Sequence, residues 1–249
     1  MIKIRELKKY FNSTKKVLDG VDLDIEQGKI TVIIGRSGEG KSVLIKHIIG
    51  LLKPDYGSIT VDDEELTSMD ERHLNILRKR FGMLFQSAAL FDSMTVAENV
   101  GFPLKEHTDM DDKTIMNIVI DKLKRVGLVG VENMMPADLS GGMKKRVGLA
   151  RAIVMDPEIV LFDEPTTGLD PIMSDSIADL MLTTQRGLKT TYVAITHDIP
   201  LTYKIADKIA MLHEGKIIET GTVDEMKSSS NPVLRQFLEG RAEGPIKVY

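Results

Sequence analysis

The apolar residues of this chain follow two patterns, short continuous runs and stripes with helical spacing. Mostly apolar runs occupy residues 30–34, 81–85, 159–162 and 191–195. Runs of this length without polar alternation indicate strands that are buried on both faces, as in a parallel sheet. Segments of helical length lie between the runs, and an alternation of strands with helices is typical of an α/β core.

Near the N-terminus, the pattern alternates instead. The alternating apolar positions are Ile2, Ile4 and Leu7, followed by Val21, Leu23 and Ile25. Such spacing predicts half-buried strands. We expect residues 8–14 between them to form a polar loop with Tyr10 and Phe11, where one ring stacks on a planar ligand or both pack at the strand ends. Near the other end of the chain, residues 208–219 form a predicted hairpin.

Helical patterning dominates from residue 87 to residue 131. The stripe Ile115, Ile118, Val119, Lys122, Leu123 and Val126 has the spacing of an amphipathic helix, with Lys122 at its edge. Further helices are expected at 43–52, 70–79, 143–155, 174–186 and after Pro232. We therefore predict an α/β core at 1–86 and 159–227, an inserted helical subdomain at 87–158, and a C-terminal helix and tail at 228–249.

The helix expected at 143–155 carries four cations on its polar side, Lys144, Lys145, Arg146 and Arg151. Such a cluster can bind phosphate, but a charge pattern of this kind more often forms a solvated helix face. The sequence favours the solvated face.

Residues 35–42 read GRSGEGKS and match the Walker A pattern G-x-x-x-x-G-K-[ST] between a predicted strand and a predicted helix. Main-chain N–H groups of such a loop curl around the β- and γ-phosphates, Lys41 reaches the terminal phosphates, and the Ser42 hydroxyl ligates Mg²⁺. The predicted nucleotide-binding residues here are Gly35, Arg36, Ser37, Gly38, Glu39, Gly40, Lys41, Ser42 and Val43. Because Glu39 brings a negative charge near a polyanion, we expect its side chain to face solvent.

Two carboxylates, Asp163 and Glu164, follow the run 159–162. Ligands of open α/β sheets bind just beyond the carboxyl ends of the strands. Asp163 is therefore placed to hold the water shell of Mg²⁺, and Glu164 to polarise an attacking water; the alternative is a pair that caps the next helix. His197 follows the last of the runs in the same way, although a lone histidine there is more often structural.

Composition limits the classes of function. The chain has 249 residues, of which 42% are hydrophobic and 28% charged, with a formal net charge of −4. This is ordinary for a globular protein, and the balance argues against a nucleic-acid groove, which needs a basic patch. The lack of cysteine excludes disulfides, thiolate zinc sites and cysteine nucleophiles. We see no signal-peptide core and no apolar stretch that would span a bilayer, so we expect any membrane role to come from a partner chain.

Together, these motifs resemble those of the nucleotide-binding subunits of ATP-binding cassette (ABC) transporters. The phosphate loop, Gln86, the L-S-G-G stretch 139–142, the strand with its carboxylates at 159–164, the G-L-D stretch 168–170 and His197 occur in the family's order. The resemblance covers essentially the whole chain. It implies the α/β fold of a P-loop NTPase cassette, with a mixed sheet core, an N-terminal antiparallel β-subdomain and an inserted helical subdomain.

The resemblance also implies roles for single residues. Phe11 would stack on adenine, Gln86 would sense Mg²⁺ and the γ-phosphate where the helical subdomain meets a permease, and Asp170 would contact the opposite subunit. Glu164 would be the catalytic base, and His197 would contact the γ-phosphate. The predicted catalytic residues are thus Glu164, His197 and Gln86, and the predicted metal ligands are Ser42, Gln86 and Asp163.

The L-S-G-G stretch gives a physical reason for dimerisation. Ser140, Gly141 and Gly142 open a helix and so form a second anion-binding terminus. The chain has one phosphate loop, so two copies arranged head to tail would each close this terminus over the other's ATP. Met143 replaces the glutamine usual in the family, and the closing contact then rests on main-chain N–H groups and Ser140.

Several stretches narrow the resemblance to the ATPases of the maintenance-of-lipid-asymmetry (Mla) branch. They are 83–91, 103–108, 139–143, 235–240 and 243–245. This resemblance implies a peripheral homodimeric ATPase at the cytoplasmic face of the bacterial inner membrane, which uses ATP and Mg²⁺ to drive phospholipid movement. The implied partners are a second copy, membrane permease subunits, a small regulatory subunit and a periplasmic lipid-binding subunit, with no nucleic acid.

Three rival functions are less well supported by the residues. An importer ATPase for a polar solute, such as an amino acid, shares every ABC motif and differs only in the stretches that resemble the lipid branch. A soluble ABC ATPase of DNA repair or translation usually has coiled-coil insertions or tandem cassettes, and neither occurs here. A small-molecule P-loop kinase is disfavoured by Glu164 and by the L-S-G-G stretch.

Overall fold

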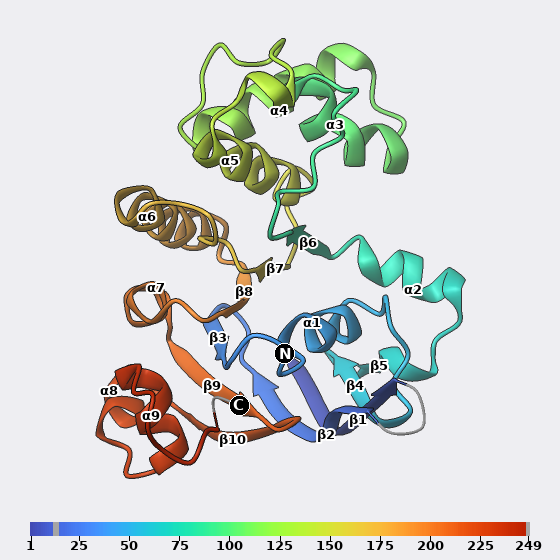
Figure 1. The fold of residues 1–249 in the computed structure, drawn as a ribbon. Coiled ribbons are helices and arrows are strands. Elements are labelled where there is room, and N and C mark those ends of the chain that lie inside the picture. The colour runs from blue at the N-terminus through green and yellow to red at the C-terminus, as the bar shows by residue number, and fades with distance from the viewer. Residues whose placement is uncertain (12–14, 248–249) are drawn as a thin grey trace. The chain divides into compact units, whose positions relative to one another are not determined.

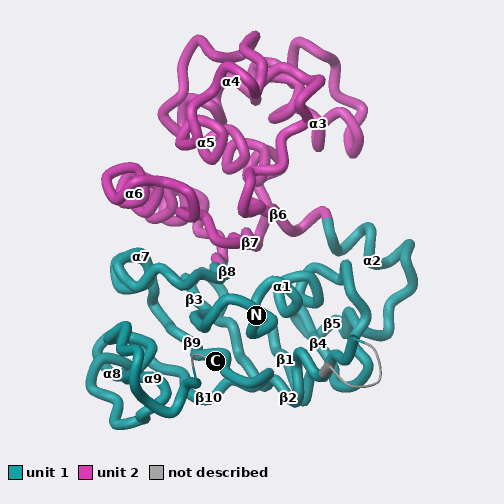
Figure 2. Tube along the Cα trace, in the orientation of Figure 1, with its two compact units in different colours: residues 1–78, 193–249 teal, residues 79–192 magenta. Residues whose placement is uncertain are grey.

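The computed structural model describes residues 1–11 and 15–247. The chain forms two compact units, one of residues 1–78 with 193–249 and one of residues 79–192 (Figure 2). The domain boundaries expected from the sequence divide the chain differently and stay a prediction.

An antiparallel sheet lies in the first unit, with its strands in the order β2-β1-β4-β5 (Figure 1). The strands are β1 (Ile2–Phe11), β2 (Lys15–Ile25), β4 (Tyr56–Val61) and β5 (Glu64–Glu65). The alternating apolar residues of β1 and β2 are buried, with Ile4 opposite Leu23, as the pattern predicts. The polar loop expected at 8–14 is wrong for residues 8–11, because they continue β1 and stay paired with β2. Residues 12–14 lie outside the described residues.

A second sheet in the same unit places β3 (Ile30–Ile34) between β9 (Lys208–His213) and β8 (Thr191–Thr196), which enters this unit at Val193. All five residues of β3 are buried, and β3 runs parallel to β9. β9 and β10 (Lys216–Gly221) pair antiparallel, which confirms the predicted hairpin and makes the sheet mixed.

Helices and short turns complete the description of the first unit. They are α1 (Lys41–Ile48), η1 (Leu66–Ser68), α2 (Glu71–Arg78), α7 (Ile199–Ile205), α8 (Val223–Ser228) and α9 (Pro232–Glu239). The helix α1 ends before the predicted residue 52 because Gly50, with a φ of 71°, takes the left-handed conformation and donates its N–H to the carbonyl of His47.

The second unit begins with two parallel strands, β6 (Phe81–Leu84) and β7 (Ile159–Asp163). Between them in sequence lie α3 (Val96–His107), α4 (Asp112–Arg125), η2 (Pro136–Asp138) and α5 (Gly141–Ala152). α3, α4 and α5 pack against one another, and α5 also packs against β6. α6 (Pro171–Leu188) follows β7 and leads into β8. A helical segment thus interrupts the strands in sequence, as the patterning indicates.

Capping side chains decide where the helices of this unit begin. Thr95 and Glu98 form a reciprocal capping box at α3, and Asp111 caps α4. Ser140 caps α5 and Asp170 caps α6, so both helices start a few residues earlier than their apolar patterns indicate. Of the helices in the described residues, none combines the length and the apolar character that crossing a membrane requires.

Candidate functional site

The phosphate loop joins β3 to α1 in the first unit. Gly40 precedes α1 with a φ of 99°, and a Cβ there would lie 2.9 Å from the main-chain oxygen of Val17 on β2. A side chain would be both strained and crowded at this point, which accounts for the glycine. The first turn of α1 directs main-chain N–H groups out of the helix end, and this arrangement binds phosphate in proteins.

The Lys41 side chain folds back toward the start of the phosphate loop. Its ammonium donates to the carbonyl oxygens of Gly35 at 2.7 Å and of Arg36 at 3.0 Å, and the residue is only 5% exposed. Its neighbour Ser42 is half-buried, and the carbonyl of Val43 accepts from Nδ1 of His47 at 2.7 Å. The ammonium is thus held against carbonyl oxygens at the start of the loop, and its predicted phosphate contact stays a prediction.

Glu39 does not face solvent, and this prediction is wrong. Its Oε2 accepts from the main-chain N–H of Glu214 at 2.7 Å, and its Oε1 lies 3.4 Å from Nδ1 of His213. The side chain is 15% exposed. The turn of the β9–β10 hairpin supplies a donor that the local sequence does not show, so the negative charge is bound to the hairpin.

Arg36 gives the loop a second anchor. Its guanidinium donates to the carbonyl oxygen of Lys247 in the C-terminal tail at 2.8 Å. The tail is itself fixed by Gln236 on α9, which exchanges two hydrogen bonds with the main chain of Ile246. Ser37 and Gly38 at the tip of the loop are exposed.

The aromatic candidates and the histidine also lie in the first unit. Tyr10 and Phe11 at the end of β1 are 37% and 39% exposed, so neither ring packs in the core and both stay available for stacking. The choice between them stays open. His197 is exposed and follows β8, the strand beside β3, directly before Asp198, which caps α7.

The two carboxylates lie at the end of β7 in the second unit. Asp163 and Glu164 are each 9% exposed. Glu164 has a φ of 50°, a left-handed conformation that costs about 1–2 kcal/mol for a residue with a side chain. Its Oε2 accepts from the Thr167 hydroxyl at 3.2 Å. The alternative of a helix-capping pair is wrong, because Asp170 caps the next helix instead.

Gln86 follows β6, and its side chain is exposed. Two residues later, the chain makes an unusual turn, in which Ala88 and Ala89 have φ values of 61° and 47°. Two successive non-glycine residues in this region are strained and need support from their surroundings.

That support comes from α5, and it corrects the prediction of a solvated cationic face. Lys145 is only 5% exposed, and its ammonium donates to the main-chain oxygens of Gln86 at 2.5 Å and Glu164 at 3.1 Å. Arg151 donates to the main-chain oxygens of Ala88 at 2.5 Å and Ala89 at 2.8 Å. Both residues are functional candidates that sequence reasoning missed.

Burial has electrostatic consequences for these cations. It lowers the pKa of Lys145 to about 8, although the charges of Asp163 and Glu164 act in the opposite direction. Burial also lowers the pKa of Arg151. The apolar run V-G-L-A at 147–150, directly beside the cations, was the available signal that this helix is enclosed.

The L-S-G-G stretch begins α5 as predicted. The Ser140 hydroxyl oxygen accepts from the N–H of Met143 at 3.3 Å. Gly141 is exposed at the helix start, whereas Gly142 is buried against Met173, whose side chain a Cβ there would meet. Asp170, predicted to contact a second subunit, caps α6 by accepting from the N–H groups of Ile172 and Met173 at 2.9 and 3.0 Å.

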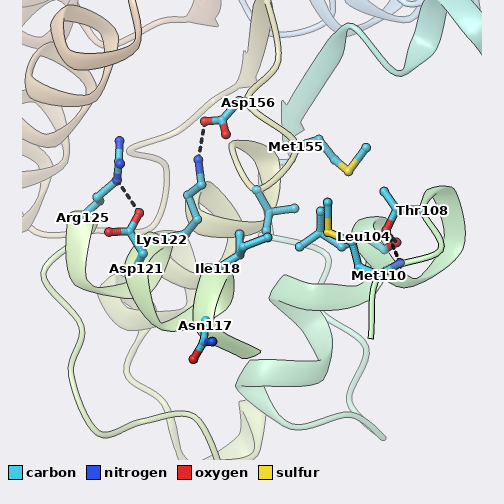
Figure 3. Close-up of a pocket in the computed structure, with 11 residues that line it drawn as sticks. Leu104, Thr108, Met110, Asn117, Ile118, Asp121, Lys122, Arg125, Met155 and Asp156 are labelled. Carbon is cyan, nitrogen blue, oxygen red and sulfur yellow. Dashed lines mark hydrogen bonds and ion pairs between the residues drawn. The ribbon is translucent and has the colours of Figure 1, made fainter. Parts of the chain in front are cut away.

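A separate hollow of about 470 Å³ lies among the helices of the second unit (Figure 3). Two ion pairs line it, Lys122 with Asp156 and Arg125 with Asp121. Lys122 is 3% exposed, so it is buried and not at the helix edge as expected. None of the predicted site residues lines this hollow.

The structure thus divides the predicted residues between the units. The phosphate loop, Phe11 and His197 lie in the first, and the remaining predicted residues, Gln86, Ser140, Gly141, Gly142, Asp163, Glu164 and Asp170, lie in the second. Within the second unit, Lys145 connects the main chains of Gln86 and Glu164. The roles predicted for these residues stay predictions.

Comparison with known proteins confirms the resemblance to ABC transporter subunits that the motifs indicate. The family description "ABC transporter" matches residues 18–167. The intermembrane phospholipid transport system ATP-binding protein MlaF of Escherichia coli (strain K12) is 41% identical over 230 residues, 92% of this chain and 86% of that protein. The probable ribonucleotide transport ATP-binding protein mkl of Mycobacterium leprae (strain TN) is 41% identical over 245 residues, 98% of this chain and 70% of that protein.

Solved structures agree with the fold. A dimeric ATP-binding cassette in a post-hydrolysis state with ADP and Pi is 30% identical with a TM-score of 0.82, covering 90% of this chain and 99% of that one. The cbiO1 protein of Clostridium perfringens, part of the ABC transporter complex cbiONQ, is 31% identical with a TM-score of 0.84, covering 94% of this chain and 93% of that one. These similarities confirm the predicted fold class.

Proposed function

This chain belongs to the ABC transporter family as an ATP-hydrolysing cassette, and on that premise we propose that it powers the movement of phospholipid, or a related hydrophobic molecule, across the bacterial envelope. The observation that carries the proposal is the 41% identity to the E. coli phospholipid transport protein along 86% of that protein's length. The stretches after Gln86 and near the C-terminus that resemble the lipid branch support it.

The proposed reaction is hydrolysis of ATP to ADP and phosphate. The amides of residues 35–42 and the Lys41 ammonium bind the phosphates, and Phe11 stacks on the base. Glu164 accepts a proton from the attacking water, and His197 contacts the γ-phosphate and orients that water. Two observations support this role: Glu164 has a left-handed backbone, and its carboxylate accepts from the Thr167 hydroxyl.

Mg²⁺ belongs to the proposal as well. The donors predicted for it are the Ser42 hydroxyl, the Asp163 carboxylate and the Gln86 amide, an all-oxygen set that suits this ion. When bound, the ion would neutralise charge on the phosphate oxygens.

We propose that two copies act head to tail, each closing Ser140, Gly141 and Gly142 over the other's ATP, with Asp170 at the same interface. The solved cassette with ADP and Pi is described as dimeric. The proposed location is the cytoplasmic face of the inner membrane, on permease subunits, with a small regulatory subunit and a periplasmic lipid-binding subunit as further partners.

A second candidate cargo is a ribonucleotide, a polar solute, because the mycobacterial relative is named for it at the same identity. Affinity purification from native membranes, followed by mass spectrometry of proteins and lipids, separates the two. A permease with a lipid-binding subunit and bound phospholipid supports the proposal. A permease with a solute-binding protein would overturn the lipid cargo, and a protein recovered without any permease would overturn transport.

The catalytic assignment has its own test. Glu164→Gln keeps the side-chain shape and removes the base, so we expect ATP binding to persist, turnover to fall by at least about a hundredfold, and a dimer to accumulate in ATP. Turnover at the native rate would remove Glu164 from the role of base and leave the cargo question untouched.

A further inference from the structure

We propose that Lys145 and Arg151 are positioning residues for ATP hydrolysis. From α5 they bind the main chain of the segments that present Gln86 and Glu164. The inference rests on the proposed roles of those two residues, and it adds two residues to which no role in the reaction is otherwise given.

The first part of the argument is that Lys145 joins two separate segments. Its ammonium donates to the carbonyl of Gln86, just after β6, and to the carbonyl of Glu164, just after β7. β6 and β7 are parallel neighbours, so the two segments follow the strands at the same, carboxyl-terminal end of the sheet. One buried cation therefore fixes the distance between the backbone of the predicted sensor and the backbone of the predicted base.

Arg151 continues this support along the loop. It stands six residues further along α5, and its two terminal nitrogens donate to the carbonyls of Ala88 and Ala89. Its guanidinium also lies 6.0 Å from the centre of the Phe91 ring. The segment from Gln86 to Phe91 is therefore held to α5 at several points.

The hydrogen bonds from Lys145 and Arg151 go to residues with strained backbone. Glu164, Ala88 and Ala89 all have positive φ, and the carbonyl of each accepts a bond from one of these two cations. Such conformations persist where surrounding bonds compensate for them, and they gather at functional sites. Both cations bind main-chain oxygens in these contacts, so they set the direction of a segment and leave the Gln86 and Glu164 side chains to other partners.

A mechanical consequence follows from where α5 begins. Its first turn is the L-S-G-G stretch, capped by Ser140, and the helix is continuous from Gly141 to Ala152. A displacement of that first turn, when it closes on a nucleotide, would shift Lys145 and Arg151 with it. The same helix would thereby transmit closure to Gln86 and Glu164.

The test compares Lys145→Met with Lys124→Met, which removes an exposed lysine on α4, in the purified full chain. Removing the donor deprives the Gln86 and Glu164 carbonyls of their shared partner, and a shift of about 1 Å in a catalytic group can cost about a hundredfold in rate. We expect Lys145→Met to lower kcat by about ten- to a hundredfold while the KM for ATP stays within about twofold. Lys124→Met should retain the native kcat.

Two further measurements separate positioning from loss of the fold. Because both acceptors are carbonyls, a neutral donor can replace the ammonium in part, so Lys145→Gln should recover a kcat between those of the native chain and Lys145→Met. Hydrogen exchange of the amides at 86–89 should quicken in Lys145→Met and in Arg151→Met. It should not change in Arg125→Met, which removes an arginine that binds Asp121 on α4.

Each outcome decides the matter. If Lys145→Met turns over like Lys124→Met while Glu164→Gln is inactive, the positioning role is refuted and the proposed function stands. If Lys145→Gln is no better than Lys145→Met and amide exchange rises across the whole unit, the residue merely holds the fold and the inference fails. If Glu164→Gln itself turns over at the native rate, the catalytic assignment beneath the inference is refuted.

Discussion

Gly40 offers a quantitative test of how the phosphate loop is built. Its φ of 99° lies in the left-handed region, and a Cβ would lie 2.9 Å from the Val17 carbonyl oxygen, 2.9 Å from Val17 Cγ1 and 3.2 Å from Leu18 Cδ2. Gly38 in the same loop has a φ of 86°, but nothing lies within 4 Å of its Cβ position. Alanine at either position therefore meets the same backbone strain, and only Gly40→Ala adds steric overlap.

The magnitudes follow from these two terms. Left-handed backbone costs an alanine about 1–2 kcal/mol, so Gly38→Ala should destabilise the chain by about that amount. Overlap with a fixed carbonyl adds about 1–3 kcal/mol for Gly40→Ala. In a protein of this size, each kcal/mol shifts Tm by about 2–4 °C. We therefore expect Gly40→Ala to unfold about 2–12 °C below Gly38→Ala.

Thermal unfolding followed by circular dichroism measures this difference directly, and titration with ATP measures its consequence. Gly40→Ala should also bind ATP more weakly than Gly38→Ala, because displacing β2 or the loop moves the amides that open α1. Equal Tm values for the two variants would refute the reasoning, since the contact with Val17 would then not constrain the loop.

Three further predictions concern the first unit. Lys41→Ala should abolish measurable ATP binding, because it removes the ammonium that the sequence assigns to the terminal phosphates; an unchanged Kd in a calorimetric titration would sink that assignment. Glu39→Ala should lower the free energy of unfolding by about 0.5–1.5 kcal/mol, since the N–H of Glu214 loses its acceptor, whereas Glu39→Gln, which keeps an acceptor oxygen, should lose less in urea titrations. Burial lowers the pKa of His47 below its ordinary value of 6.5, so the unfolded chain takes up a proton first as the pH falls. Stability should therefore decrease from pH 6.5 down to the folded pKa, by up to about 1.4 kcal/mol per pH unit, and this decrease should be smaller in His47→Gln; identical pH profiles would contradict it.

Glu39 and Lys145 illustrate why parts of the site escaped the sequence. The local pattern around Glu39 shows a charge in a glycine-rich loop, and its partner on the β9–β10 hairpin lies 175 positions away. The cations of α5 show a polar stripe, but a stripe does not reveal what packs on it. In both cases, a charged side chain is satisfied by main-chain groups, which carry no sequence signature.

The sequence by itself determined the strand and helix order, the α/β class and the identity of the phosphate loop. Those features depend on local periodicity and on a loop whose glycines are required by its own backbone. Only the tertiary structure decided which charges are buried, that Arg36 and Glu39 anchor the loop to the tail and the hairpin, and that Lys145 and Arg151 hold strained carbonyls near Gln86 and Glu164. These contacts depend on which distant segments the folded chain brings within hydrogen-bonding distance, and a buried bond such as that from Lys145 to the Glu164 carbonyl is stronger than it would be in water.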